Sequence, residues 1–160
     1  MRGKIFLVGD DIDTDQLAPG HFMLGGIEKL ARHCLASSYP NFSKKVKPGD
    51  ILVAGNNFGI GSSREQAAEA LKFLGIVAVI AVSFGGIFYR NAINIGLPVI
   101  NSKNLSMVRD GDWGTLNIQD EKLLLEKSNT MVKLEPIPNY LQGILFDGGL
   151  VPHLKKRFKK

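Results

Sequence analysis

The chain has 160 residues, 44% of them hydrophobic and 22% charged, which is typical of one globular domain. No apolar run approaches the roughly 18 residues of a membrane-spanning helix, and no signal-peptide pattern is present, so we expect a cytoplasmic protein. The net charge of +5 lies in the last ten residues, which hold five basic side chains and no acid. The neutral body argues against a nucleic-acid binder. We expect one domain over residues 1–150 and a frayed, solubilising tail over 151–160, with docking to an acidic partner as the alternative.

Strand-like and helix-like patterns alternate along the first two thirds of the chain. Strands are expected at 4–8, 50–54, 76–82 and 97–100, helices at 27–36, 63–74 and 83–95, and loops at 10–20, 21–26 and 37–49. The remainder is richer in β-structure, with strands at 113–118, 122–126 and 131–134 and a helix at 138–146. These patterns predict one α/β domain with a mixed sheet or barrel flanked by helices.

Metal-ligating residues are sparse. Cys34 is the single cysteine, so it can form no internal disulfide and cannot by itself hold an iron–sulfur cluster or a structural zinc. The three histidines are scattered without the spacing of metal ligands. We therefore expect no metal and no cofactor on this chain, and we expect Cys34 to be a buried apolar residue.

The segment from Gly55 to Gln66 joins an expected strand to an expected helix and holds serines, glycines and an arginine that can serve a binding site. A helix start offers unpaired N–H groups and can hold an anion, and an arginine such as Arg64 fits a carboxylate. The alternative is a structural turn, because Ser62 and Ser63 each begin a capping-box pattern. A P-loop is excluded because no lysine is present, and the dinucleotide pattern lacks its third glycine.

The segment from Gly9 to Gln16 is a second candidate, with aspartates at alternate positions. It is not an EF-hand, because Gln16 stands at the required glycine and Phe22 at the closing glutamate. The sequence leaves two interpretations open. The segment is a turn with local side-chain bonds, or one aspartate orients a partner group across a site.

Three blocks together resemble a known family. They are Asp-Ile-Asp-Thr-Asp at 11–15, Gly-Ile-Gly-Ser-Ser-Arg-Glu at 59–65, and the stretch from Ser83 to Pro98. In this order they resemble the small subunits of 3-isopropylmalate dehydratases, which are equivalent to the swivelling domain of the aconitase superfamily. The similarity runs over nearly the whole chain, from about Lys4 to Gly149. It implies a swivelling β/β/α domain.

The resemblance also implies roles for individual residues. Ser62 would be the catalytic serine that removes and returns the substrate proton, and Arg64 would clamp a substrate carboxylate. Asp15 would be the family's active-site aspartate. The substrate-binding set would consist of Arg64, Ser63, Gly61, Thr14, Phe22, Met23 and Leu24. The [4Fe-4S] cluster would lie on a large subunit, which would be the partner of this chain together with a small dicarboxylate substrate.

Two positions depart from the family pattern. Gly86 stands where relatives often carry arginine, and Phe22-Met23-Leu24 stands where many carry a Tyr-Leu-Arg-Thr variant. No Lys or Arg lies between Asp15 and Lys29, so we expect this apolar loop to favour an alkyl arm on the substrate. The leading hypothesis is a 2-alkylmalate dehydratase subunit of leucine biosynthesis. The alternatives are a homoaconitase, methylmalate or dimethylmalate type of subunit, or a non-catalytic anion-binding regulatory module.

Overall fold

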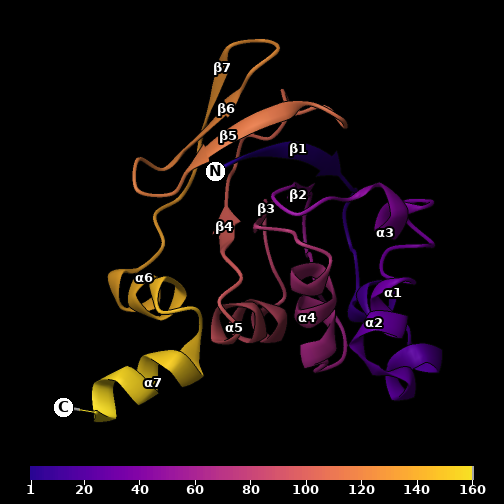
Figure 1. Ribbon diagram of the computed structural model, residues 1–160. Coiled ribbons are helices and arrows are strands. Elements are labelled where there is room, and N and C mark those ends of the chain that lie inside the picture. The colour runs from indigo at the N-terminus through magenta and orange to yellow at the C-terminus, as the bar shows by residue number, and fades with distance from the viewer. Residues whose placement is uncertain (160) are drawn as a thin grey trace.

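The structure is a computed structural model that describes residues 1–159 and is built on one seven-stranded mixed sheet (Figure 1). The strand order is β4-β3-β2-β1-β5-β6-β7. Strands β1 to β4 run parallel, and β5 to β7 continue the sheet in antiparallel fashion from the other side of β1. The strands are β1 (Arg2–Leu7), β2 (Ile51–Ala54), β3 (Ala78–Ala81), β4 (Val99–Asn101), β5 (Trp113–Asn117), β6 (Lys122–Leu125) and β7 (Thr130–Lys133).

Helices cover one face of the parallel half and lie below it in Figure 1. The helices are α1 (Thr14–Leu17), α2 (Gly26–Ala31), α3 (Phe42–Lys45), α4 (Glu65–Phe73), α5 (Gly86–Asn94), α6 (Asn139–Phe146) and α7 (Leu150–Phe158), with a 3₁₀ turn, η1, at Gly20–Gly25. Within residues 1–159, no helix is long and apolar enough to cross a membrane. The mixed sheet and the helices on its face confirm the predicted α/β fold with a mixed sheet flanked by helices.

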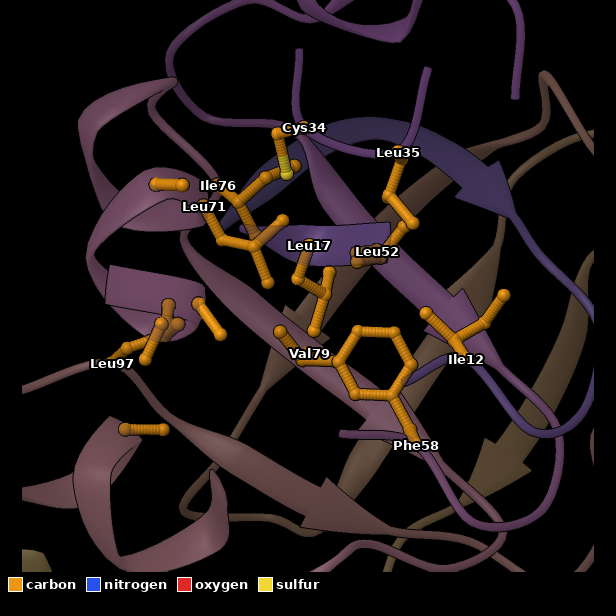
Figure 2. Packing of buried hydrophobic residues seen from close by; sticks show 14 of the residues in the cluster. Ile12, Leu17, Cys34, Leu35, Leu52, Phe58, Leu71, Ile76, Val79 and Leu97 are labelled. Atoms are coloured by element: carbon orange, nitrogen blue, oxygen red, sulfur yellow. The ribbon is translucent and has the colours of Figure 1, made fainter. Parts of the chain in front are cut away.

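Two hydrophobic clusters lie on opposite faces of the parallel strands, because successive side chains of a strand alternate between faces. Leu52 and Val79 belong to the cluster under the helices, which Figure 2 shows together with Leu17 of α1 and Leu71 of α4. Ile51 belongs to the second cluster, which is completed by side chains from β5 to β7. The sheet curls over this second cluster, so β2 and β3 are buried on both faces. For this reason their sequences are continuous apolar runs.

Several predicted boundaries differ from the structure. Helix α2 ends at Ala31 and not at residue 36, because Leu35 adopts a φ of +56° and donates its N–H to the carbonyl of Gln16. Helix α4 starts at Glu65, two residues later than expected. The loops expected at 10–20, 21–26 and 37–49 each contain a short helical turn.

The prediction of a frayed tail is wrong, because Leu150–Phe158 forms helix α7, which packs on α6 and α5. Leu150, Leu154 and Phe158 recur every four residues, which is a helical spacing that the basic residues between them obscure. Asp147 accepts hydrogen bonds from Lys156 at 2.7 Å and pairs with His153 at 2.7 Å. These contacts tie the helix to the end of α6.

Candidate active site

The three sequence blocks that carry the family resemblance meet on one side of the parallel half. The N–H of Gly59 donates to the carbonyl of Ile12 at 2.6 Å, and the N–H of Thr14 donates to the carbonyl of Ile60 at 2.8 Å. Phe58 donates to the carbonyl of Ser83 at 3.0 Å. Backbone bonds therefore hold the aspartate segment and the start of the third block against the turn that leads into α4.

Glycine is required where these segments touch. Gly59 has a φ of +77°, and a Cβ there would lie 2.3 Å from Cγ of the buried Phe88. A Cβ on Gly85 would lie 2.6 Å from the carbonyl oxygen of Gly59. Neither position can accept a side chain without moving the turn, so these two glycines set the path of the chain toward Ser62.

Ser62 and Ser63 lie in the turn before α4 with exposed side chains. The residue preceding the helix is Arg64, in an extended conformation, and no side chain caps the helix start. The capping interpretation of the two serines is therefore wrong. The capping box that does form lies in the aspartate segment, where the Asp13 carboxylate accepts from the N–H of Gln16 and the Gln16 side chain accepts from the N–H of Asp13.

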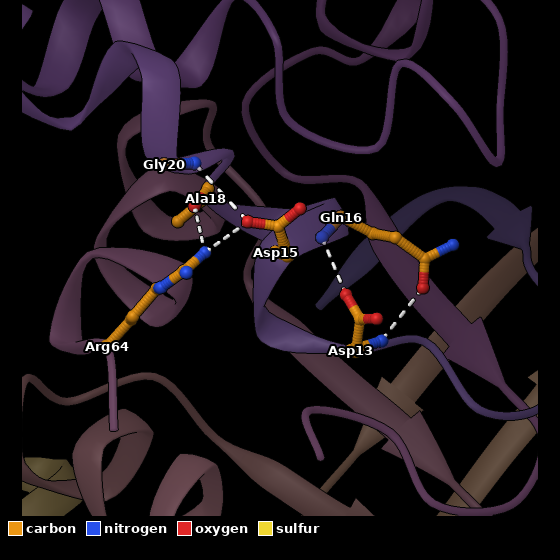
Figure 3. Close-up of polar contacts among 6 residues, drawn as sticks. All are labelled: Asp13, Asp15, Gln16, Ala18, Gly20 and Arg64. Atoms are coloured by element: carbon orange, nitrogen blue, oxygen red, sulfur yellow. Dashed lines mark hydrogen bonds and ion pairs between the residues drawn. The ribbon is translucent and has the colours of Figure 1, made fainter. Parts of the chain in front are cut away.

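Arg64 points back from the start of α4 onto the aspartate segment (Figure 3). Its Nη1 donates to Oδ1 of Asp15 at 2.6 Å and to the carbonyl of Ala18 at 2.9 Å. The same Oδ1 accepts the N–H of Gly20 at 3.3 Å. The sequence indicated Arg64 and Asp15 as site residues but gave no sign of Ala18 and Gly20, because both contribute backbone atoms.

These contacts fix the charge of Asp15. The hydrogen bond from Arg64, with a smaller contribution from the N–H of Gly20, holds the pKa of the Asp15 carboxyl below its usual range. Asp15 is therefore an anion at neutral pH. The Arg64 side chain is only 21% exposed, so its guanidinium is held in place at the surface of the site.

Two predicted substrate-binding residues have different positions in the structure. Thr14 is buried, and a Cβ on Gly61 would lie 3.2 Å from its Oγ1. Gly61 is exposed, with a φ of +102°. Thr14 thus lies beneath the turn and supports Gly61, whereas Gly61 and the two serines face solvent.

The apolar loop at the 3₁₀ turn η1 offers one free side chain. Phe22 stacks on His33, with ring centroids 3.6 Å apart, and Met23 packs against the core. Leu24 is fully exposed. Of the three apolar side chains expected to face a substrate arm, only Leu24 is therefore free of contacts with the core.

In the part of the chain that the structure describes, the donor set does not fit a metal cluster. Across residues 1–159, no three or more His, Cys, Asp or Glu side chains are placed together to hold a metal ion. Cys34 is buried, and burial raises the pKa of its thiol far above the usual range. A buried neutral thiol is a poor metal ligand and a poor nucleophile.

Comparisons with known proteins identify similar chains. The family model of the aconitase C-terminal domain matches residues 34–105. The 3-isopropylmalate dehydratase small subunit 1 of Thermotoga maritima is 43% identical over 158 residues, which cover 98% of this chain and 95% of that protein. The methanogen homoaconitase small subunit of Methanocaldococcus jannaschii is 47% identical over 159 residues, which cover 98% of this chain and 92% of that protein.

A solved structure is also closely similar. The crystal structure of 3-isopropylmalate dehydratase (leuD) from Methanocaldococcus jannaschii superposes with a TM-score of 0.93 at 47% sequence identity. The match covers 98% of this chain and 93% of that chain. The curled mixed sheet and its helical layer are therefore shared along essentially the full length.

Proposed function

The chain belongs to the 3-isopropylmalate dehydratase small-subunit family of hydro-lyases in the aconitase superfamily, and from this premise we propose which of its residues do the chemistry. Ser62 is the base that takes and returns a substrate proton, and Arg64 binds a substrate carboxylate. The substrate is a 2-alkylmalate, dehydrated and rehydrated in leucine biosynthesis. The observation that carries this proposal is an exposed serine that does not cap the helix, two residues from an arginine that is held in place.

The environment of Ser62 supports its role as a base. An isolated serine hydroxyl is a very weak base, so its alkoxide must be stabilised by nearby positive groups. The turn that carries Ser62 leads into α4, whose first N–H groups lack intrahelical partners and form the positive end of the helix dipole. The Arg64 guanidinium is paired with Asp15, so its positive charge is partly offset. The start of the helix therefore favours an alkoxide at this turn over one in open solvent.

The remaining parts of the active site are assigned to a partner. Because the donor set described above does not fit an iron–sulfur cluster, we propose that the [4Fe-4S] cluster is held by a large subunit, which also removes the substrate hydroxyl. The relatives are named as small subunits, which supports a two-subunit enzyme. As expected from the sequence, the proposal places the complex in the cytoplasm.

The loop at η1 supports an alkyl arm on the substrate. Leu24 presents an apolar side chain, and no Lys or Arg lies between Asp15 and Lys29. Burying an unpaired carboxylate is costly, whereas each buried CH₂ group gains about 0.8 kcal/mol. The similarity to a homoaconitase small subunit supports an acidic-arm substrate as the second candidate, which would need Arg32 or a cation of the large subunit.

The test uses Ser62→Ala in a complex reconstituted with the large subunit. We expect wild-type complex to dehydrate an alkylmalate, each subunit alone to be inactive, and Ser62→Ala to lose turnover. Because Ser62 caps no helix, the melting temperature of the Ser62→Ala variant should stay within about 1 °C of wild type. Loss of a true cap would instead lower the free energy of unfolding by about 0.5–2 kcal/mol. Unchanged turnover in Ser62→Ala would remove this residue from the mechanism.

A further inference from the structure

The Asp15 carboxylate accepts hydrogen bonds both from the carboxylate-binding arginine and from the loop that carries Leu24. Its Oδ1 accepts from Nη1 of Arg64 and from the N–H of Gly20, which is the first residue of η1. The carbonyl of Ala18 takes a second bond from the same Nη1. The chain from Asp15 to Gly20 thus wraps around one end of the guanidinium (Figure 3).

This arrangement leaves the other edge of Arg64 for a ligand. Elsewhere in the chain, Arg2 shows how that edge is used, because its Nε and Nη2 donate to the two oxygens of Glu126 at 2.8 and 2.9 Å. None of the described residues accepts from Nε or Nη2 of Arg64. A two-pronged bond to a carboxylate requires both atoms in one plane, so a guanidinium held by Nη1 presents a pre-oriented fork.

We propose, on the basis of the proposed function, that Asp15 is a positioning residue that fixes the Arg64 fork and the start of the arm-facing loop together. Through this shared oxygen, binding of the malate carboxylate and selection among substrate arms are coupled. Asp15 does not transfer the substrate proton. Its Oδ1 is occupied by two donors, Nη1 of Arg64 and the N–H of Gly20, which oppose uptake of a proton at that atom.

The helix that contains Asp15, α1, is capped by a different residue. Asp13, and not Asp15, caps α1, so removing the Asp15 charge leaves the capping box intact. Asp15 is also 68% exposed, so its loss opens no cavity in the core. A change at Asp15 should therefore act through Arg64 and the loop, and not through a general loss of stability.

The experiment compares Asp15→Asn with Asp13→Asn in the complex with the large subunit. Both changes remove one charge from the same turn, and asparagine retains an acceptor that can cap α1. We expect Asp15→Asn to raise KM for an isopropyl-substituted malate at least about tenfold, with kcat within about threefold of wild type. Its preference for the isopropyl over a methyl arm should shrink by a similar factor. Asp13→Asn should change neither quantity, and Asp15→Glu should recover part of the lost affinity.

A second measurement does not need the partner. Hydrogen exchange in the isolated chain should become faster over residues 20–26 in Asp15→Asn and stay unchanged in Asp13→Asn. A collapse of kcat with unchanged KM would overturn the positioning role in favour of proton transfer, and identical behaviour of the two variants would overturn it altogether. A wild-type complex without activity on any alkylmalate would instead refute the proposed function, and the exchange experiment would still decide whether Asp15 holds the loop.

Discussion

Replacing Gly59 with alanine should destabilise the chain strongly, although it adds only one methyl group. A Cβ at this position would lie 2.3 and 2.5 Å from Cγ and Cβ of Phe88, which is fully buried and packs edge-on against Phe58. Overpacking of this kind costs about 1–3 kcal/mol. The left-handed φ of +77° adds about 1–2 kcal/mol for a residue with a Cβ.

Together these effects amount to a loss of about 2–5 kcal/mol. For a chain of this size, that corresponds to a fall in melting temperature of about 4–20 °C. Gly86→Ala is the matched control, because a Cβ there meets nothing within 4 Å and Gly86 is the first residue of α5. The control should melt at the wild-type temperature or slightly above it, since alanine is the better helix former.

Thermal and denaturant unfolding of the isolated chain measure both variants without any partner. Equal melting temperatures for the two variants, or a fall of less than about 2 °C in Gly59→Ala, would refute the argument that the turn is held by a glycine-only contact. Because Gly59 lies three residues before Ser62, Gly59→Ala should also lower kcat of the reconstituted complex at temperatures where the variant is folded.

Two other changes test the site, and the reactivity of Cys34 tests the core. Arg64→Lys should raise KM by at least about tenfold, because lysine keeps the charge but cannot form a two-pronged bond, and steady-state kinetics will show it. Wild-type complex should prefer alkyl arms to acidic arms by at least about tenfold in kcat/KM, and Leu24→Arg should erode that preference in competition assays. A preference of the wild type for an acidic arm would disprove our view of the loop. Native Cys34 should resist alkylating reagents at neutral pH and react only after unfolding, because burial raises its pKa.

The fold was largely predictable because its strands are short apolar runs with clear boundaries. The β-branched composition of the stretch from Ile76 to Val82 alone predicts a buried strand, and β3 lies within this stretch. The tail was not predictable in this way. Between Leu150 and Phe158 a run of three basic residues interrupts the apolar ones, and the contact that holds the helix, from Lys156 to Asp147, depends on packing that a local pattern does not reveal.

For the candidate site, the sequence indicated residues but not their geometry. The pair of serines matches a capping box, yet Gly61 at a φ of +102° extends the turn and delays the helix to Glu65. The bond between Asp15 and Arg64 joins positions separated by 49 residues, and no local pattern predicts such a contact. Only the fold, which bridges Asp13 and Ile60, brings them together.

The central place of β1 in the sheet has a consequence for how the chain folds. Its parallel partner β2 is available early, but β5 supplies the other edge from far along the chain, and the amino group of Met1 reaches Leu116 across 115 residues. Pairings of such long range form slowly. Until β5 has docked, β1 presents a row of unpaired peptide groups, which is a surface on which another copy of the chain can add a strand. During refolding at high protein concentration, docking of β5 therefore competes with aggregation through the open edge of β1.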